Sequence, residues 1–224
     1  MLKSVIIVAG GSGTRMQNSL PKQFIKVLEK PLMVHTIEAF LHYDSEIQVV
    51  VVLPHDHFDT WNEIKKEYLT DQEIGIAEGG ETRFQSVRQG LKLVKGELVA
   101  IHDAVRPMIS SEVIDAAFQS AMKKGSGVAM VPVKDSIRET HGDQTIARDR
   151  SLYYQVQTPQ TFQMSLISKA FERKEMTTFT DDASVFEAAG MSVERVDGDY
   201  RNIKITTPED LILAEAILKN EKSL

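Results

Sequence analysis

Residues 5–16, VIIVAGGSGTRM, decide the fold class, because an apolar run ends there in a glycine-rich turn. The apolar run has the composition of a buried strand, and Gly10, Gly11 and Gly13 allow a ligand to approach the backbone closely. A glycine turn between a strand and a helix usually binds phosphate groups. The stretch therefore predicts a nucleotide-binding turn in an α/β protein.

The turn matches neither standard phosphate-binding motif. A dinucleotide fingerprint needs glycine at the position of Met16, and a P-loop needs glycine at the position of Arg15. Lys22 follows soon after, and Pro21 disfavours helix just before it, which places this lysine on the loop after the turn. Two cations beside a glycine turn fit a triphosphate and stabilise charge on an attacked phosphorus. The alternative is that both are solvated surface residues.

Composition narrows the class of protein. The chain has 224 residues and 42% hydrophobic residues, which suits one sizeable α/β domain. A formal net charge of −6 argues against broad attachment to nucleic acid, and the lack of cysteine excludes disulfides, thiolate metal sites and cysteine nucleophiles. No apolar run approaches the roughly 18–20 residues of a membrane span. With no leader before the first strand, we expect a cytoplasmic protein without a membrane partner.

Apolar runs and helical patterns alternate outward from the turn. The predicted strands are residues 4–9, 47–53, 74–77, 97–101 and 127–131. The predicted helices are residues 31–43, which start at Pro31, 82–95 and 110–124. This order predicts an α/β fold with a mainly parallel twisted sheet and helices on both faces. Ligands of such sheets bind at the C-terminal ends of the strands.

Two further segments carry candidate functional residues. In IHDAVRP, Asp103 ends an apolar strand, where a carboxylate can hold Mg²⁺ together with substrate phosphates. The alternative is that Asp103 caps local amides. In NIKITTPEDL, we expect Lys204 in a short strand facing the ligand, although a strand lysine also marks a sheet edge. Thr207 is the predicted cap of the next helix, and Pro208 its first residue.

Residues 134–150, KDSIRETHGDQTIARDR, break the pattern, because eight of the seventeen are charged. Such a segment cannot bury an apolar face of its own. It is either a solvated loop or a hairpin that turns at Gly142 and becomes ordered against a partner chain.

The chain resembles the 2-C-methyl-D-erythritol 4-phosphate cytidylyltransferases of the non-mevalonate isoprenoid pathway. Seven stretches carry the resemblance, in order from residue 4 to about residue 219: AGGSGTRM, PKQF, GGETRFQSV, HDAVRP, QTPQTF, TDDAS and NIKITTPEDL. The resemblance implies a Rossmann-like nucleotidyltransferase fold in a single domain, residues 1–224, with a dimerisation arm at about 134–157. It also implies Mg²⁺-dependent transfer of CMP from CTP to a polyol phosphate, by a homodimer that exchanges arms.

The resemblance also implies roles for individual residues. Arg15, Lys22 and Lys204 would grip the triphosphate and stabilise the pentacoordinate phosphorus, and Asp103 would bind Mg²⁺. Together with Gly11 and Gly13 of the turn, the residues around the nucleotide would be Ala9, Gly10, Gly80, Glu81, Ser86 and Ala104. The residues around the second substrate would be Arg106, Thr180 and Thr206, with Ser136 and Arg150 contributed by the partner's arm. Many relatives have aspartate in place of Glu81 and threonine in place of Ser136, and both replacements keep the polar group.

Two other interpretations stay open at this point. Ribitol 5-phosphate cytidylyltransferases share the glycine turn, PKQF and QTPQTF, while TDDAS and TTPEDL favour the methylerythritol enzymes. A non-catalytic nucleotide-binding module is the more distant alternative. The joint presence of Arg15, Lys22, Asp103 and Lys204 argues against it, because simple binding does not require such a cluster at one phosphorus.

Overall fold

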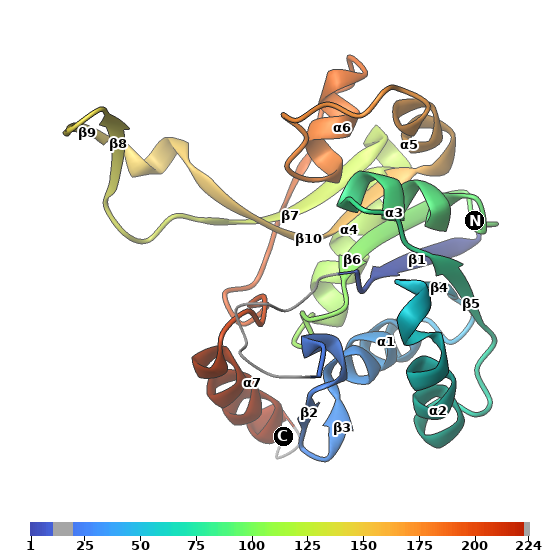
Figure 1. The fold of residues 1–224 in the computed structure, drawn as a ribbon. Coiled ribbons are helices and arrows are strands. Elements are labelled where there is room, and N and C mark those ends of the chain that lie inside the picture. Colours follow the sequence, from blue (N-terminus) through green and yellow to red (C-terminus); the bar gives the residue numbers. More distant parts are fainter. Residues whose placement is uncertain (11–19, 222–224) are drawn as a thin grey trace.

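A computed structural model describes residues 1–10 and 20–221 of the chain (Figure 1). The central sheet is formed by β1 (Lys3–Val8), β4 (Gln48–Leu53), β5 (Ile74–Glu78), β6 (Leu98–Asp103), β7 (Ser126–Pro132), β10 (Tyr154–Gln163) and β11 (Arg195–Asp197). Their spatial order is β11-β7-β10-β6-β1-β4-β5. All neighbouring strands are parallel except β10, which runs antiparallel to both β6 and β7. The predicted mainly parallel sheet is confirmed.

The strand order creates a switch point beside β1. From β1 the chain proceeds to β4 and β5 on one side, and it then returns to β6 on the other side. Both neighbours of β1 are parallel to it, and Val8 lies opposite Asp103 at the C-terminal ends of β1 and β6. In open α/β sheets, ligands bind in the crevice at such a reversal.

Helices cover both faces of the sheet, as the strand–helix alternation predicts. They are α1 (Leu32–Tyr43), α2 (Phe58–Tyr68), α3 (Arg83–Leu91), α4 (Ser111–Lys124), α5 (Met164–Phe171), α6 (Asp182–Ala188) and α7 (Pro208–Glu221). Val5 and Ile7 of β1 pack in one buried cluster with α1, α2 and α4. Ile6 points the opposite way, into a second cluster with α3, α5 and α6. The alternating side chains of one strand therefore join two cores.

Local signals explain where the helices begin and end. Ser110 accepts a hydrogen bond from the Val113 amide at the start of α4, and Gly125 ends that helix with a φ of 96°. Pro31 is the N-cap of α1 rather than its first residue, which shifts the predicted start by one position. One helix, α5, has no counterpart among the sequence-predicted elements.

The segment around Lys204 differs from the sequence expectation. It is not a strand: residues 202–206 form a loop, in which the Ile205 amide donates to the Val105 carbonyl at 3.0 Å. The predicted cap of α7 is correct, since the Asp210 amide donates to Thr207 Oγ1 and α7 starts at Pro208.

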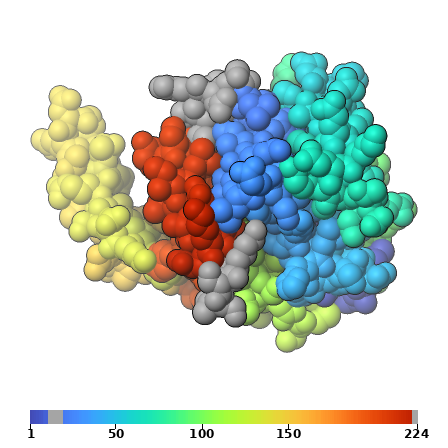
Figure 2. Space-filling model, turned by 90° about the horizontal axis from the view of Figure 1, so that it is seen from below, coloured from blue at the N-terminus to red at the C-terminus, as the bar shows by residue number. Residues whose placement is uncertain are grey.

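The charged segment is a hairpin that turns at Gly142, as the second of its two interpretations predicts. β8 (Ile137–His141) pairs with β9 (Gln144–Arg148), and Gly142 in the turn has a φ of 59°. The hairpin extends away from the rest of the molecule on the long β7–β10 ribbon (Figure 1), and it stands clear of α7 in the space-filling view (Figure 2). We call residues 134–157 the arm. Its ordering against a second chain stays a prediction.

A third, smaller apolar cluster closes the end of the molecule near α7. There Ala214 and Leu218 of α7 cluster with Val27 of the short hairpin formed by β2 (Lys26–Val27) and β3 (Lys30–Pro31), and with Leu32 and Met108. No helix in the described part of the chain is long and apolar enough to cross a membrane.

Candidate active site

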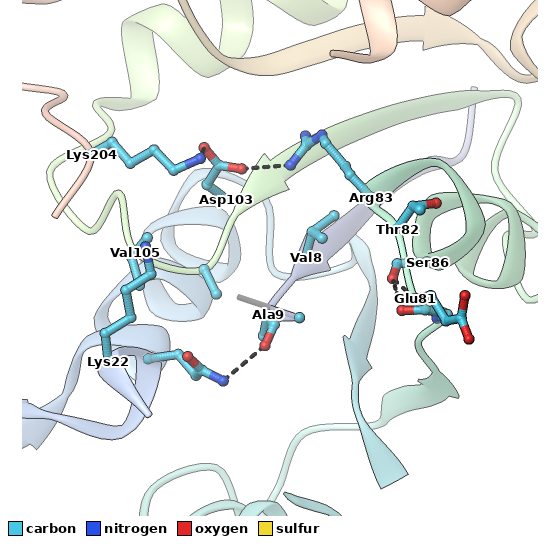
Figure 3. A pocket seen from close by; sticks show the side chains of 14 residues that line it. Val8, Ala9, Lys22, Glu81, Thr82, Arg83, Ser86, Asp103, Val105 and Lys204 are labelled. Carbon is cyan, nitrogen blue, oxygen red and sulfur yellow. Dashed lines mark hydrogen bonds and ion pairs between the residues drawn. The ribbon is translucent and has the colours of Figure 1, made fainter. Parts of the chain in front are cut away.

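A cavity of about 230 Å³ opens at the C-terminal ends of β1 and β6 (Figure 3). Its lining includes the candidate catalytic or metal-binding residues Lys22, Asp103 and Lys204. The resemblance implies six nucleotide-binding residues within the described part of the chain, and all six also line this cavity: Ala9, Gly10, Gly80, Glu81, Ser86 and Ala104. Residues from five separate stretches of sequence therefore meet in one place, at the switch point of the sheet.

Asp103 lies at the centre of a cluster of cations. Its Oδ1 accepts a hydrogen bond from Arg83 Nη1 at 2.7 Å, and its Oδ2 lies 3.0 Å from Lys204 Nζ and 3.2 Å from Arg106 Nε. Figure 3 shows Arg83 and Lys204 approaching this carboxylate from opposite sides. Burial opposes ionisation of Asp103, but the three positive charges outweigh burial and hold the pKa of this carboxyl well below its ordinary range. Asp103 is therefore ionised near neutral pH.

Arg106 connects β6 to the loop that carries Lys204. Its guanidinium donates from Nη1 to the Asn202 carbonyl at 2.7 Å, and the Ile205 amide pairs with the Val105 carbonyl. These two contacts fix the loop on either side of Lys204. A lysine that is about a hundred residues away in sequence is thereby held against the carboxylate.

The loop before α3 presents backbone groups to the cavity. Ser86 Oγ accepts from the Gly80 amide at 3.1 Å, and Thr82 caps α3 by accepting from the Gln85 amide. A Cβ at Gly80 would lie 2.4 Å from the Cβ of Gln85, so this close turn requires glycine. The glycine turn and the N-terminus of α3 form one edge of the site.

Lys22 lies on the opposite edge, in the short helix η2 (Lys22–Phe24). The neighbouring Gln23 is buried and donates from Nε2 to the Ala9 carbonyl at 2.8 Å, which ties η2 to the end of β1. Lys22 is thereby directed to the cavity from the loop where the sequence predicts it. The candidates Gly11, Gly13 and Arg15 lie outside the described residues.

A second cavity of about 310 Å³ shares Arg83, Asp103 and Lys204 with the first. Two of the residues predicted to contact the second substrate, Arg106 and Thr180, line it. The two cavities therefore meet at the central carboxylate, as expected of a site that brings two substrates together.

The remaining second-substrate candidates lie elsewhere in the single chain. The Thr206 hydroxyl donates to Asp210 Oδ2 at 3.0 Å and belongs to the cap of α7. Ser136 and Arg150 are exposed on the arm, where Arg150 Nη1 donates to the Lys134 carbonyl. The structure of one chain does not bring these two arm residues to the cavities.

Asp103 is also the group that could hold a metal ion. Within residues 1–10 and 20–221, no cluster of three or more His, Cys, Asp or Glu side chains is present. Mg²⁺ is commonly bound through one or two carboxylates completed by substrate phosphates. An ionised carboxylate that lines both cavities fits that mode. A divalent ion at Asp103 would compete with Arg83, Arg106 and Lys204 for its oxygens.

The sequence model of 2-C-methyl-D-erythritol 4-phosphate cytidylyltransferases matches residues 3–220. The chain belongs to this family. It is 44% identical to the 2-C-methyl-D-erythritol 4-phosphate cytidylyltransferase of Bacteroides fragilis, over 97% of this chain and 100% of that protein.

Solved structures agree with this membership. The 4-diphosphocytidyl-2C-methyl-D-erythritol synthase of Anaerococcus prevotii superposes with a TM-score of 0.83 at 32% identity, covering 97% of this chain and 98% of that one. The cytidylyltransferase of Thermus thermophilus gives a TM-score of 0.78 at 30% identity, covering 98% and 100%. The Rossmann-like nucleotidyltransferase fold is confirmed, and the family assignment makes the chain a cytidylyltransferase.

One residue of this cytidylyltransferase site, Arg83, escaped the sequence-based prediction. Arg83 lines both cavities, and Asp182 of the TDDAS stretch is its second carboxylate partner at 2.6 Å. Arg83 lies in the quoted GGETRFQSV stretch, in the first turn of α3, and was not singled out. One signal was present: a cation is unfavourable at a helix N-terminus, so an arginine at the first position of α3 points to anionic partners.

Proposed function

We propose that this protein transfers CMP from CTP to 2-C-methyl-D-erythritol 4-phosphate in a Mg²⁺-dependent reaction, which releases pyrophosphate. The observation that carries the proposal is the ionised Asp103 among Arg83, Arg106 and Lys204, at the point where two cavities meet. Such an arrangement can accept two polyanions and a divalent cation at one place. Family membership names the substrates.

The first cavity is the proposed nucleotide site. Its glycine turns at Gly10 and Gly80 leave room for a base and ribose near the backbone, and Ser86 supplies a hydroxyl beside them. The triphosphate would extend toward Lys22 and, in this proposal, toward Arg15. Backbone amides and cations are the usual partners of phosphate groups.

The reaction needs charge neutralisation more than proton transfer. A phosphate oxygen of the second substrate attacks the α-phosphorus of CTP, and the bond to the bridging oxygen breaks, with its electron pair leaving on pyrophosphate. The attacking oxygen is already anionic near neutral pH, so no strong general base is required. Lys22 and Lys204 would hold the two phosphate groups in line and offset the charge that gathers on the phosphorus.

Asp103 would hold the metal ion in this proposal. When bound, Mg²⁺ would supply further neutralisation of the triphosphate and its leaving group. Arg83 and Arg106 keep the carboxylate ionised and oriented in the absence of substrate.

The arm would complete the second cavity of a neighbouring chain in a cytoplasmic homodimer. The hairpin is polar, but its base exposes apolar side chains, among them Leu152 at 77% and Tyr153 at 41%. Exposed apolar groups beside a polar hairpin are typical of a protein interface. In this proposal Ser136 and Arg150 reach the second substrate from the partner chain, while Thr180 and Thr206 belong to the same chain.

The test is pyrophosphate release from CTP with two candidate acceptors under matched Mg²⁺. We expect kcat/KM for 2-C-methyl-D-erythritol 4-phosphate to exceed that for ribitol 5-phosphate by ~10²-fold or more, because hydrogen-bonded hydroxyl groups discriminate strongly. A reversed preference would move the protein to the ribitol branch. Absence of pyrophosphate with either acceptor would overturn the assignment.

A further inference from the structure

Asp182 is a buried carboxylate whose burial the local helix does not explain. It is the first residue of α6 and only 1% exposed. The N-cap of α6 is already supplied by Asp181, whose Oδ1 accepts from the Ser184 amide at 2.9 Å. An acid in a first helical turn is ordinarily exposed, and burial of a carboxylate is costly unless its charge is paired.

The pairing partner of Asp182 is Arg83. Nη2 of this guanidinium donates to Asp182 Oδ2 at 2.6 Å, while Nη1 donates to Asp103 Oδ1 at 2.7 Å. One arginine on α3 therefore joins a carboxylate on β6 to a carboxylate on α6. Arg83 lines both cavities, whereas Asp182 is not among the described residues that line either one. Arg83 therefore links Asp182 to both cavities.

The position of Asp182 is itself fixed from the sheet. Gln160 of β10 donates from Nε2 to Asp181 Oδ2 at 2.9 Å, and its Oε1 accepts from the Ala183 amide at 2.8 Å. These two hydrogen bonds flank Asp182 in the chain and hold the start of α6 against the strand. The carboxylate is therefore a rigid support for the guanidinium.

The electrostatic roles of the two carboxylates differ. Asp103 faces three cations, which lower the pKa of its carboxyl, whereas burial raises the pKa of Asp182, which has Arg83 as its one cationic hydrogen-bond partner in the described structure. A metal ion at Asp103 would compete with the cations that now contact that carboxylate. Arg83 would then depend on Asp182 for its place.

We propose that Asp182 is a positioning residue that holds Arg83 at the boundary between the nucleotide cavity and the second-substrate cavity. The proposal rests on the function proposed above and adds to it a residue that touches neither substrate. With Asp182 in place, the guanidinium stays where the two phosphate groups meet while Asp103 exchanges its cation contacts. Without that support, the guanidinium is free to turn onto Asp103 alone.

The test begins with Asp182→Asn, which keeps the shape of the side chain and removes its charge. We expect kcat to fall by about tenfold or more, because misplacement of a positioning group by about 1 Å has effects of that size or larger. The KM for CTP should change less than kcat does. Glu112→Gln is the matched control: it also removes an acid from a first helical turn, in α4, and should leave kcat unchanged.

The decisive comparison uses the Arg83→Ala background. If Asp182 acts through Arg83, adding Asp182→Asn to Arg83→Ala should not lower kcat/KM any further. It should also raise the melting temperature, because Arg83→Ala alone leaves a buried carboxylate without its partner. The melting comparison needs no turnover, and the double variant contains no unpaired buried charge, so it remains informative if a single variant folds poorly.

Three results would overturn the inference. The first is a wild-type kcat in Asp182→Asn. The second is an equal fold-loss from Asp182→Asn in the wild-type and Arg83→Ala backgrounds, which would show an effect on α6 independent of Arg83. The third is a melting temperature that falls again when Asp182→Asn is added to Arg83→Ala. A wild-type protein without cytidylyl transfer would instead contradict the proposed function.

Discussion

Lys204 contacts Asp103 in the substrate-free structure, although the side chain is 43% exposed. A half-exposed ion pair adds little to the free energy of unfolding, so this contact does not explain why a lysine is held there. A charge directed at reacting phosphate groups has a larger effect, because it acts where negative charge develops. Lys204 and Lys22 are therefore expected to matter for rate much more than for stability.

Substitution of the two lysines tests whether they affect the reaction rate more than the free energy of unfolding. Lys22→Ala and Lys204→Ala should each lower kcat by roughly 10²-fold, as when a preorganised charge donor is removed. Urea denaturation should show an almost unchanged free energy of unfolding. Lys124→Ala, which removes an exposed ion pair with Glu194, is the control and should change neither quantity. Rates within threefold of wild type for both site variants would contradict their roles.

His102 makes the stability of the protein depend on pH. The ring is completely buried beside Asp103, its Nε2 donates to the Arg106 carbonyl at 3.2 Å, and burial lowers the pKa of His102 to about 3. The unfolded chain binds a proton near pH 6.5, so this contribution to stability is present above pH 6.5 and is lost as the pH falls toward 3. The free energy of unfolding should decrease by about 1.4 kcal/mol per pH unit over that range.

The measurement is urea denaturation between pH 6.5 and 5, where most carboxylates stay ionised. His102→Gln keeps a donor near the position of Nε2 and removes the titrating group. Its unfolding free energy should be lower near neutral pH and should vary less with pH than that of the wild type. Parallel curves for the two proteins would show that another group causes the dependence.

At the scale of elements, α3 is the helix whose placement matters most to the site, because it carries Arg83 and Ser86. The helix packs on the sheet at Gly90, where a Cβ would lie 2.9 Å from methyl carbons of both Ile6 and Val52. This glycine is needed for close approach rather than for an unusual backbone angle. The contact at Gly90 therefore sets the distance between α3 and β1.

Gly90→Ala should force α3 away from the sheet and destabilise the protein by about 1–3 kcal/mol, the usual effect of overpacking a core. Because Arg83 moves with the helix, kcat should fall as well. Arg88→Ala on the exposed side of α3 is the control and should change the unfolding free energy by less than about 0.5 kcal/mol. An unaltered melting temperature in Gly90→Ala would show that the helix adapts without strain.

The elements also show what the sequence reveals and what it does not. β1, β4 and β6 are continuous apolar runs between turn signals, so period and composition identify them. β10 was not predicted, because its sequence, YQVQTPQTFQ, includes several polar residues and a proline. Its pairing register with β7 also shifts between Val156 and Gln160. Gln157, Gln160 and Gln163 of this strand form hydrogen bonds with groups far away in the sequence, which no local pattern reports.

In the candidate site, too, local patterns reveal some residues but not those that are placed by long-range contacts. Lys22 and Asp103 are recognisable because each follows a local signal, a proline-bounded loop and a strand end. Lys204 was expected in a strand, but tertiary contacts hold it in a loop. The role of Arg83 depends on carboxylates 20 and 99 positions away in the chain, so it becomes visible only in three dimensions.

At the scale of the whole molecule, the charge is arranged unevenly. The chain carries a formal charge of −6, yet the described residues that line the two cavities include four cations (Lys22, Arg83, Arg106 and Lys204) and three acids (Glu81, Asp103 and Asp181). A local positive site on an acidic protein attracts small polyanions while the overall charge disfavours long ones such as nucleic acid. The arm is the other feature of this scale, because its polar hairpin extends away from the rest of the molecule (Figure 1).

The proposed exchange of arms makes a prediction about mixed dimers. If each site combines the body of one chain with the arm of the other, Arg150→Ala spoils the site of the partner, whereas Lys204→Ala spoils the site of its own chain. Each variant alone should be nearly inactive, for two different reasons. In a mixed dimer, the body of the Arg150→Ala chain meets the intact arm of the Lys204→Ala chain, which restores one of the two sites.

Random exchange of equal amounts should therefore recover roughly a quarter of the wild-type activity, as two-fold symmetry requires. Sedimentation would verify that the wild type is a dimer, and differently tagged chains would verify that the variants exchange. Deletion of residues 137–147 should give monomers that cannot complement either variant. Mixed dimers that form but show no gain in pyrophosphate release would place Arg150 outside the partner's site.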